Sequence, residues 1–114
     1  MRYFSVILAA VAAAVSGCSH SPAVTIKNRS SVTLSNVVVS GSGFSERIDS
    51  IAIGGEHKLT VHPRGESGLG VAFDAAGRHF DAGQQDYFED GGYRITAIVS
   101  TNFTVAVSVD SRSY

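Results

Sequence analysis

The chain has 114 residues, one cysteine and a formal net charge of −1. This length allows a single domain with a modest core. The nearly balanced charge argues against a nucleic-acid partner, because such proteins concentrate basic residues on one face. With Cys18 as the only cysteine, an intrachain disulfide is excluded, so the fold must depend on packing and hydrogen bonds.

The first 17 residues have the order of a secretory signal peptide. Arg2 supplies a positive charge, residues 4–15 are apolar apart from Ser5, and small residues follow at positions 16 and 17. The run of about 12 apolar residues is shorter than the roughly 20 that a membrane-spanning helix needs. We therefore expect cleavage after residue 17; the alternative is an uncleaved signal anchor, with Cys18 beside it by chance.

The stretch Val15-Ser16-Gly17-Cys18 resembles the bacterial lipobox. The resemblance implies that the Cys18 sulfur receives a diacylglycerol and that residues 18–22 form a short tether. Two or more acyl chains, such as palmitate, anchor a protein stably without a membrane-spanning segment. Ser19, rather than an aspartate, follows the cysteine, so the lipoprotein class implies the bacterial cell envelope, at the outer membrane and facing the periplasm.

From residue 23 onward the apolar residues recur with a period of two, which predicts strands. The clearest are residues 93–99, where Ile95, Ala97 and Val99 share a face, and residues 103–109, joined to them by a hairpin loop at 100–102. No segment of the mature chain keeps a helical period. We expect an all-β domain over residues 23–114, a β-sandwich of about seven strands.

Residues 24–28, 32–39 and 50–61 resemble bacterial immunoglobulin-like domains. The resemblance implies an immunoglobulin-like β-sandwich, although Ile53-Gly54 stands where the family often has proline. It indicates architecture more than function, because this fold has many roles. Residues 32–39 are a long β-branched run, which is open to pairing with another chain at a sheet edge but belongs to the core in a central strand.

Residues 81–92 are acidic and contain glycines, and we expect a loop there. Exposed aromatic residues on loops often anchor partners. The candidate interface residues are Asp86, Tyr87, Phe88, Glu89 and Asp90. The favoured alternative is that Phe88 and Tyr93 close one end of the core.

We expect no metal or cofactor. Asp81, Asp86 and Asp90 are weak calcium candidates, because they lack the residue order of an EF-hand loop. His57 and His62 are five residues apart, so on one regular strand they face opposite ways and cannot chelate together.

The sequence also predicts no catalytic residue, and we expect that the protein is not an enzyme. Ser67 lies in Gly65-Glu66-Ser67-Gly68-Leu69, which matches the G-x-S-x-G motif except at its last position. That motif requires a strand-to-helix turn, and no helical pattern follows Ser67.

The expected function is that of a lipid-anchored envelope lipoprotein with a non-catalytic binding or structural module. Its expected partners are the membrane, through Cys18, and a protein or envelope component. One alternative is a periplasmic immunity or inhibitor lipoprotein, in which the acidic residues cover a basic site. Another alternative is a carbohydrate- or calcium-binding domain that uses Tyr87, Phe88 and the carboxylates.

Overall fold

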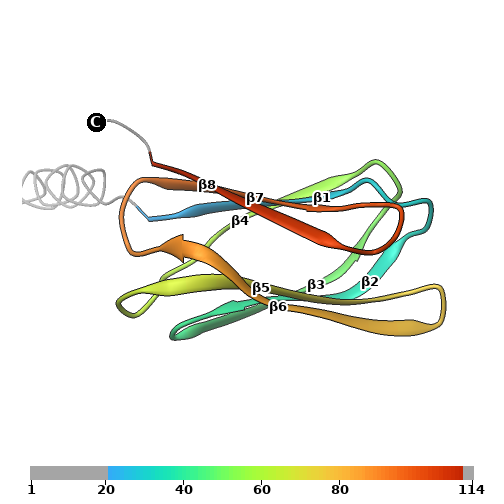
Figure 1. Ribbon diagram of the computed structural model, residues 1–114, viewed down its shortest axis with the longest axis horizontal. Coiled ribbons are helices and arrows are strands. Elements are labelled where there is room, and N and C mark those ends of the chain that lie inside the picture. Colours follow the sequence, from blue (N-terminus) through green and yellow to red (C-terminus); the bar gives the residue numbers. More distant parts are fainter. Residues whose placement is uncertain (1–20, 112–114) are drawn as a thin grey trace, which may run out of the picture.

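The computed structural model describes residues 21–111, which form eight β-strands in two four-stranded sheets (Figure 1). The strands are β1 (Ala23–Asn28), β2 (Leu34–Gly41), β3 (Phe44–Ile51), β4 (Glu56–Thr60), β5 (Ser67–Ala75), β6 (Arg78–Phe88), β7 (Tyr93–Val99) and β8 (Val105–Ser111). Residues 21–111 contain no helix. The predicted all-β fold is therefore confirmed, with eight strands where the sequence indicated about seven.

The predicted signal peptide, residues 1–17, lies outside the described residues, together with Cys18, Ser19 and His20. Residues 112–114 at the other end of the predicted domain also lie outside them. Within the described part of the chain, no helix is long and apolar enough to cross a membrane.

The strand order is β4-β1-β7-β8 in the first sheet and β3-β2-β5-β6 in the second. Three hairpins, β2–β3, β5–β6 and β7–β8, join neighbours within a sheet, and the other connections cross between the sheets. Strand β1 pairs antiparallel with β4 and parallel with β7. The first strand therefore lies inside its sheet, where strands from much later in the chain hold it on both sides.

The two sheets pack face to face over a core to which both contribute (Figure 1). Alternate side chains of a strand point to opposite faces, so every second residue is buried. In β7 these residues are Ile95, Ala97 and Val99, as the sequence predicted. Burying a side chain as large as Ile95 or Val99 contributes about 1.5–3 kcal/mol.

The β-branched run at residues 32–39 lies mainly in β2, which has β3 on one side and β5 on the other. Val37 and Val39 are fully buried. This settles the question that the sequence left open: the run is a central strand, so its backbone is paired on both sides.

The prediction of a loop over residues 81–92 is wrong, because β6 continues through these residues to Phe88. The β5–β6 pairing shifts register twice, and Gly83 and Asp86 adopt positive φ angles of 70° and 65°. Such bulges break the alternation from which a strand is recognised. An edge strand also tolerates polar residues, because most of its side chains are exposed to solvent. The turn that follows β6 comprises only residues 89–92.

Asn28, at the end of β1, connects the two sheets through its buried side chain, which is 1% exposed. Its Nδ2 group donates hydrogen bonds to the carbonyl oxygens of Val32, Ile51 and Ala52, at 2.9, 3.0 and 3.2 Å. Its Oδ1 atom accepts from the amide and the hydroxyl of Ser30, at 2.9 and 2.6 Å. One amide therefore fixes the end of β1, the turn after it and the end of β3.

We predict that Asn28→Ala lowers the free energy of unfolding by about 2–4 kcal/mol, because it leaves several buried polar groups without partners. Asn28→Asp should lower the free energy of unfolding at least as much, because a carboxylate keeps the acceptor oxygen but has no N–H groups to donate to the three carbonyl oxygens. Chemical denaturation measures both changes. Ser45→Ala, at an exposed position of β3, is the control, and a loss below about 0.5 kcal/mol for Asn28→Ala would contradict the assigned role.

Candidate functional site

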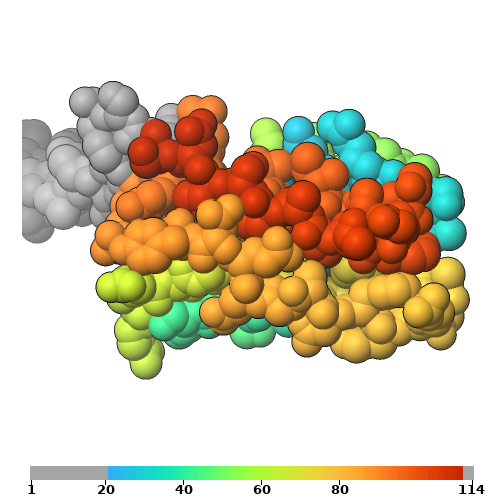
Figure 2. All heavy atoms as spheres, viewed as in Figure 1, coloured from blue at the N-terminus to red at the C-terminus, as the bar shows by residue number. Residues whose placement is uncertain are grey.

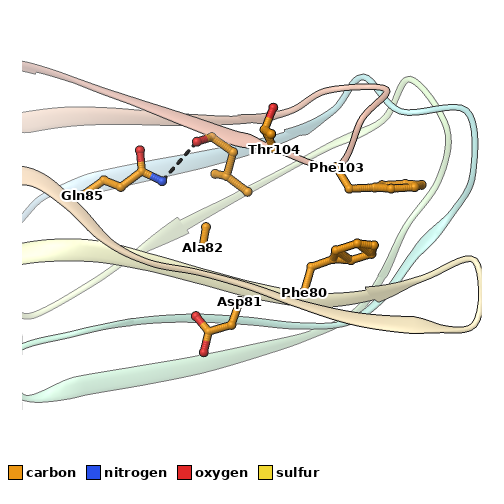
Figure 3. Close-up of a pocket in the computed structure, with 7 residues that line it drawn as sticks. Phe80, Asp81, Ala82, Gln85, Phe103 and Thr104 are labelled. Carbon is orange, nitrogen blue, oxygen red and sulfur yellow. Dashed lines mark hydrogen bonds between the residues drawn. The ribbon is translucent and has the colours of Figure 1, made fainter.

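A groove runs between β6 and β8, two edge strands on the same side of the sheets. Figure 2 shows this side, with β8 in red beside β6 in gold. The groove has a volume of about 340 Å³, which lies within the roughly 300–1,000 Å³ typical of ligand sites. Figure 3 draws the seven residues that line it: Phe80, Asp81, Ala82, Gln85, Phe103, Thr104 and Val105.

The groove is open because β6 covers the inner face of β8 incompletely. Ile95, Ala97 and Val99 of β7 are at most 1% exposed, whereas Val105, Val107 and Val109 of β8 are only half-buried. The methyl group of Ala82 is too small to fill the space between β6 and Val105 (Figure 3). The register shifts of β6 against β5 interrupt the regular pairing along this stretch. An apolar recess therefore remains at the edge of the core.

Three aromatic rings close one end of the groove. The ring centroids of Phe80 and Phe103 are 4.8 Å apart, and Phe73 lies 5.3 Å from Phe80. The Arg78 guanidinium lies over Phe80, at 5.0 Å from the ring centroid. These contacts give the groove one fixed, apolar end.

Phe103 reaches this position through a backbone conformation that is rare for a bulky residue. Its φ angle is 63°, and such strain costs on the order of 1–3 kcal/mol. The turn that holds it is heavily hydrogen-bonded: the Phe103 amide donates to the Ser100 carbonyl at 2.9 Å. Asn102 Oδ1 accepts from the hydroxyls of Ser100 and Thr104, at 2.7 and 2.8 Å. The prediction that Phe103 belongs to the same strand as Val105 is wrong, because β8 begins at Val105 and Phe103 lies in the turn before it.

The open side of β8 presents backbone polar groups. The Ser100 amide donates to the Thr104 carbonyl at 3.0 Å, so Thr104 directs its carbonyl toward β7. Successive residues of a strand direct their backbone N–H and C=O groups to opposite sides. The N–H and C=O of Val105 therefore point away from β7. Gln85 Nε2 donates to the Val105 carbonyl at 3.0 Å from that side (Figure 3).

The two predicted interface aromatics, Tyr87 and Phe88, have different surroundings. Phe88 is fully buried, and its ring lies 6.2 Å from that of Phe44. It therefore fills one end of the core and is unavailable to a partner, while Tyr93 is half-buried beside the core. Tyr87 is 48% exposed. Its hydroxyl donates to Glu89 Oε2 at 2.9 Å, and this bond raises the pKa of Tyr87 to about 12.

The predicted carboxylates are exposed but do not form a metal site. Asp81 points away from the groove (Figure 3), and its Oδ1 atom accepts from the Gly83 amide at 2.9 Å. Asp86 lies on β6, and Glu89 and Asp90 follow it. Within residues 21–111, no group of three or more His, Cys, Asp or Glu side chains is arranged to hold a metal ion.

His79 and His62 have hydrogen-bonding partners within the domain. His79 Nδ1 lies 2.7 Å from Asp74 Oδ1, and hydrogen bonds from His79 and Asn36 lower the pKa of Asp74. His62 Nδ1 lies 3.3 Å from the Ser21 hydroxyl, and His57 is exposed on β4.

Ser67 is 6% exposed. Its Oγ atom accepts from the Ser42 amide at 2.9 Å and donates to the Gly68 carbonyl at 2.7 Å. It opens strand β5, so its setting is not the strand-to-helix turn that the partial motif requires.

Sequence reasoning missed the groove, because it depends on the bulges of β6 and on which strands lie at the edges of the sheets. One signal was present: β8 has no charged residue before Asp110. Natural edge strands usually carry charges that discourage pairing, so an uncharged edge is a recognisable candidate once the strand order is known.

No protein-family model matches the chain, and no curated protein matches it. The chain is similar to a protein from Eubacterium rectale whose structure was determined by NMR. The two share 13% sequence identity with a TM-score of 0.58, over 82% of this chain and 92% of that one. At this identity the likeness shows the fold alone.

We predict that Glu89→Ala lowers the pKa of Tyr87 from about 12 toward its ordinary value of 10.0, because the hydrogen bond and the nearby charge are both lost. Glu66→Gln should lower it less, because Glu66 acts only through its charge. Ultraviolet absorbance of tyrosinate follows the titration, and Tyr87→Phe identifies its signal. Identical titration curves for Glu89→Ala and the parent would contradict this pairing.

Proposed function

We propose that this chain is a lipid-anchored protein of the bacterial cell envelope, at the outer membrane and facing the periplasm. Its β-sandwich, of the immunoglobulin-like type, serves as a non-catalytic binding module. Support for the anchor comes from the lipobox-like residues 15–18 and from Ser19 after them. Support for the non-catalytic role comes from Ser67, whose hydroxyl is already hydrogen-bonded to neighbouring backbone groups.

The observation that carries the binding role is the groove between β6 and β8. It combines half-buried valines, the Phe80–Phe103 pair and an edge strand with outward backbone groups. The strained conformation of Phe103 completes the aromatic end of the groove, and backbone strain of this kind clusters at binding and catalytic sites. Exposed apolar surface bounded by polar groups is typical of an interaction site.

A second candidate function is that of an immunity or inhibitor lipoprotein. The observation that favours it is Tyr87, which is exposed beside Glu89 and near Asp86 and Asp90. An exposed aromatic residue among carboxylates suits contact with a basic site on a toxin or hydrolase. If deletion of the gene left toxin sensitivity unchanged, this candidate would be removed.

We predict that Cys18→Ser moves the protein from the membrane fraction to the soluble fraction, because no acyl chain can then be attached. Thermal unfolding should be unchanged, since the β-domain begins after this residue. Fractionation of cells followed by immunoblotting measures the shift, with Ser19→Ala as the matched control. Full retention of Cys18→Ser in the membrane would contradict the proposed anchor.

We predict that a photo-crosslinking residue at Ala106, on exposed β8, yields a reproducible crosslinked product in intact cells. The same residue at Ser45, on the opposite edge strand β3, should yield none. Mass spectrometry identifies the product. If neither position nor other exposed positions around the domain gave a reproducible product, the binding role would be wrong.

A further inference from the structure

The four edge strands differ in how well they are protected against pairing. Strand β3 carries Glu46, Arg47 and Asp49, and strand β4 carries Glu56 and Lys58. Strand β6 carries charges and two bulges. Charges and bulges are the usual means of keeping an edge from pairing. Strand β8 has five uncharged residues before Asp110, so among the described strands its edge is the least protected.

This edge presents a row of backbone groups that only another extended chain can pair completely. Val107 and Val109 repeat the orientation of Val105, with N–H and C=O directed away from β7. The Gln85 side chain reaches only the Val105 carbonyl. An extended segment lying along β8 would pair with the whole row, as in recognition by strand addition.

The recess beside the edge accepts side chains from such a segment. A strand added to β8 would direct alternate side chains into the groove, toward Ala82 and the half-buried Val105 and Val107. The Phe80–Phe103 pair limits the recess at one end. The geometry therefore favours apolar side chains at the alternate positions.

The charged residues of the two strands that flank the groove indicate which charge a partner should carry. From residue 81 onward, β6 carries Asp81 and Asp86, and β8 carries Asp110, with no lysine or arginine on either stretch. Arg78 stacks over Phe80, and Arg94 lies opposite Asp110 on β7. A second copy of this chain, paired through β8, would bring two β6 strands of the same sign together. A basic segment is therefore favoured over a second copy.

We propose that the β8 edge receives an extended, basic segment of a partner polypeptide as a fifth strand of the first sheet. The segment's apolar side chains enter the recess over Ala82. This inference rests on the proposed binding role and names the mode of binding and the chemistry of the partner at that site.

The test uses the full chain, as processed by the cell and purified in detergent, with a capped nonapeptide of alternating valine and lysine as the probe. Binding should slow amide hydrogen exchange at Val105, Val107 and Val109, whose amides face outward in the free protein. The peptide with glutamate in place of lysine should bind at least tenfold more weakly. Raising the salt concentration should weaken binding of the lysine peptide.

Two variants separate the contributions of the edge and the recess. Val107→Pro removes an outward amide and leaves the pairing with β7, and proline is tolerated at such edge positions. Ala82→Phe fills the recess and leaves the backbone of β8 unchanged. Each variant should bind the lysine peptide at least tenfold more weakly than the parent protein does. Ser45→Pro on β3 is the control and should leave binding unchanged.

Equal binding of the lysine and glutamate peptides, or protection at β3 or β4 instead of β8, would overturn the proposal. Protection of the valine amides that depends on protein concentration alone would show that a second copy occupies the edge, and would overturn it as well. If the peptides fail while Ala106 still crosslinks a partner in cells, strand addition is wrong and the binding role stands. If Ala106 also gives no product, the binding role itself loses its support.

Discussion

The fold depends on a few buried polar contacts that lock two sheets together without a disulfide. The most connected of them is Asn28, whose side chain bonds to Ser30, Val32 and the end of β3. Its backbone also pairs with the turn before β4, through Gly54 and Gly55, at 2.9 Å each. Because every polar group of this side chain has a hydrogen-bond partner, the loss of its contacts with water on burial is compensated. Apolar packing supplies most of the stabilisation. Asn28 fixes how the ends of β1 and β3 and the segments that lead into β2 and β4 lie together.

A comparable contact fixes the opposite end of the sheets. Ser67 bonds to the Ser42 amide, and the Ser42 hydroxyl donates to the Arg64 carbonyl at 2.8 Å. Gly41 allows this close approach, since a Cβ atom there would lie 2.4 Å from Ser67 Oγ. The short connections at residues 52–55 and 89–92 also join the sheets. Within residues 21–111, no loop connects β6 directly to β8, and the hydrogen bond from Gln85 Nε2 to the Val105 carbonyl links these two edge strands.

The acidic residues acquire a different meaning once their place in the fold is known. On a loop, Asp81, Asp86 and Asp90 would be candidates for a shared cation. In the fold, Asp81 and Asp86 lie on the bulged edge strand β6, and Asp90 lies in the turn that follows it. Asp81 bonds to the Gly83 amide and points away from the groove. Together they make this flank of the domain negative, which is the basis of the proposed preference for a basic partner. The two adjacent aromatic residues also have different roles in the fold. Phe88 is buried in the core, whereas Tyr87 is exposed.

The sequence by itself determined the all-β class, the buried face of β7 and the alternation along β8, because a period of two directly records which side of a strand is buried. It also supplied the prediction for residues 1–18, which depends on local order alone. Only the tertiary structure decided that β2 is central, that β6 extends to Phe88 and that Phe103 turns inward at a φ of 63°. The first two features arise from pairing between distant strands and from bulges, and the third arises from the hydrogen bonds of the 100–104 turn. The spacing of apolar residues records none of these. The groove follows from those same features, so it became visible only when β6 and β8 were placed side by side.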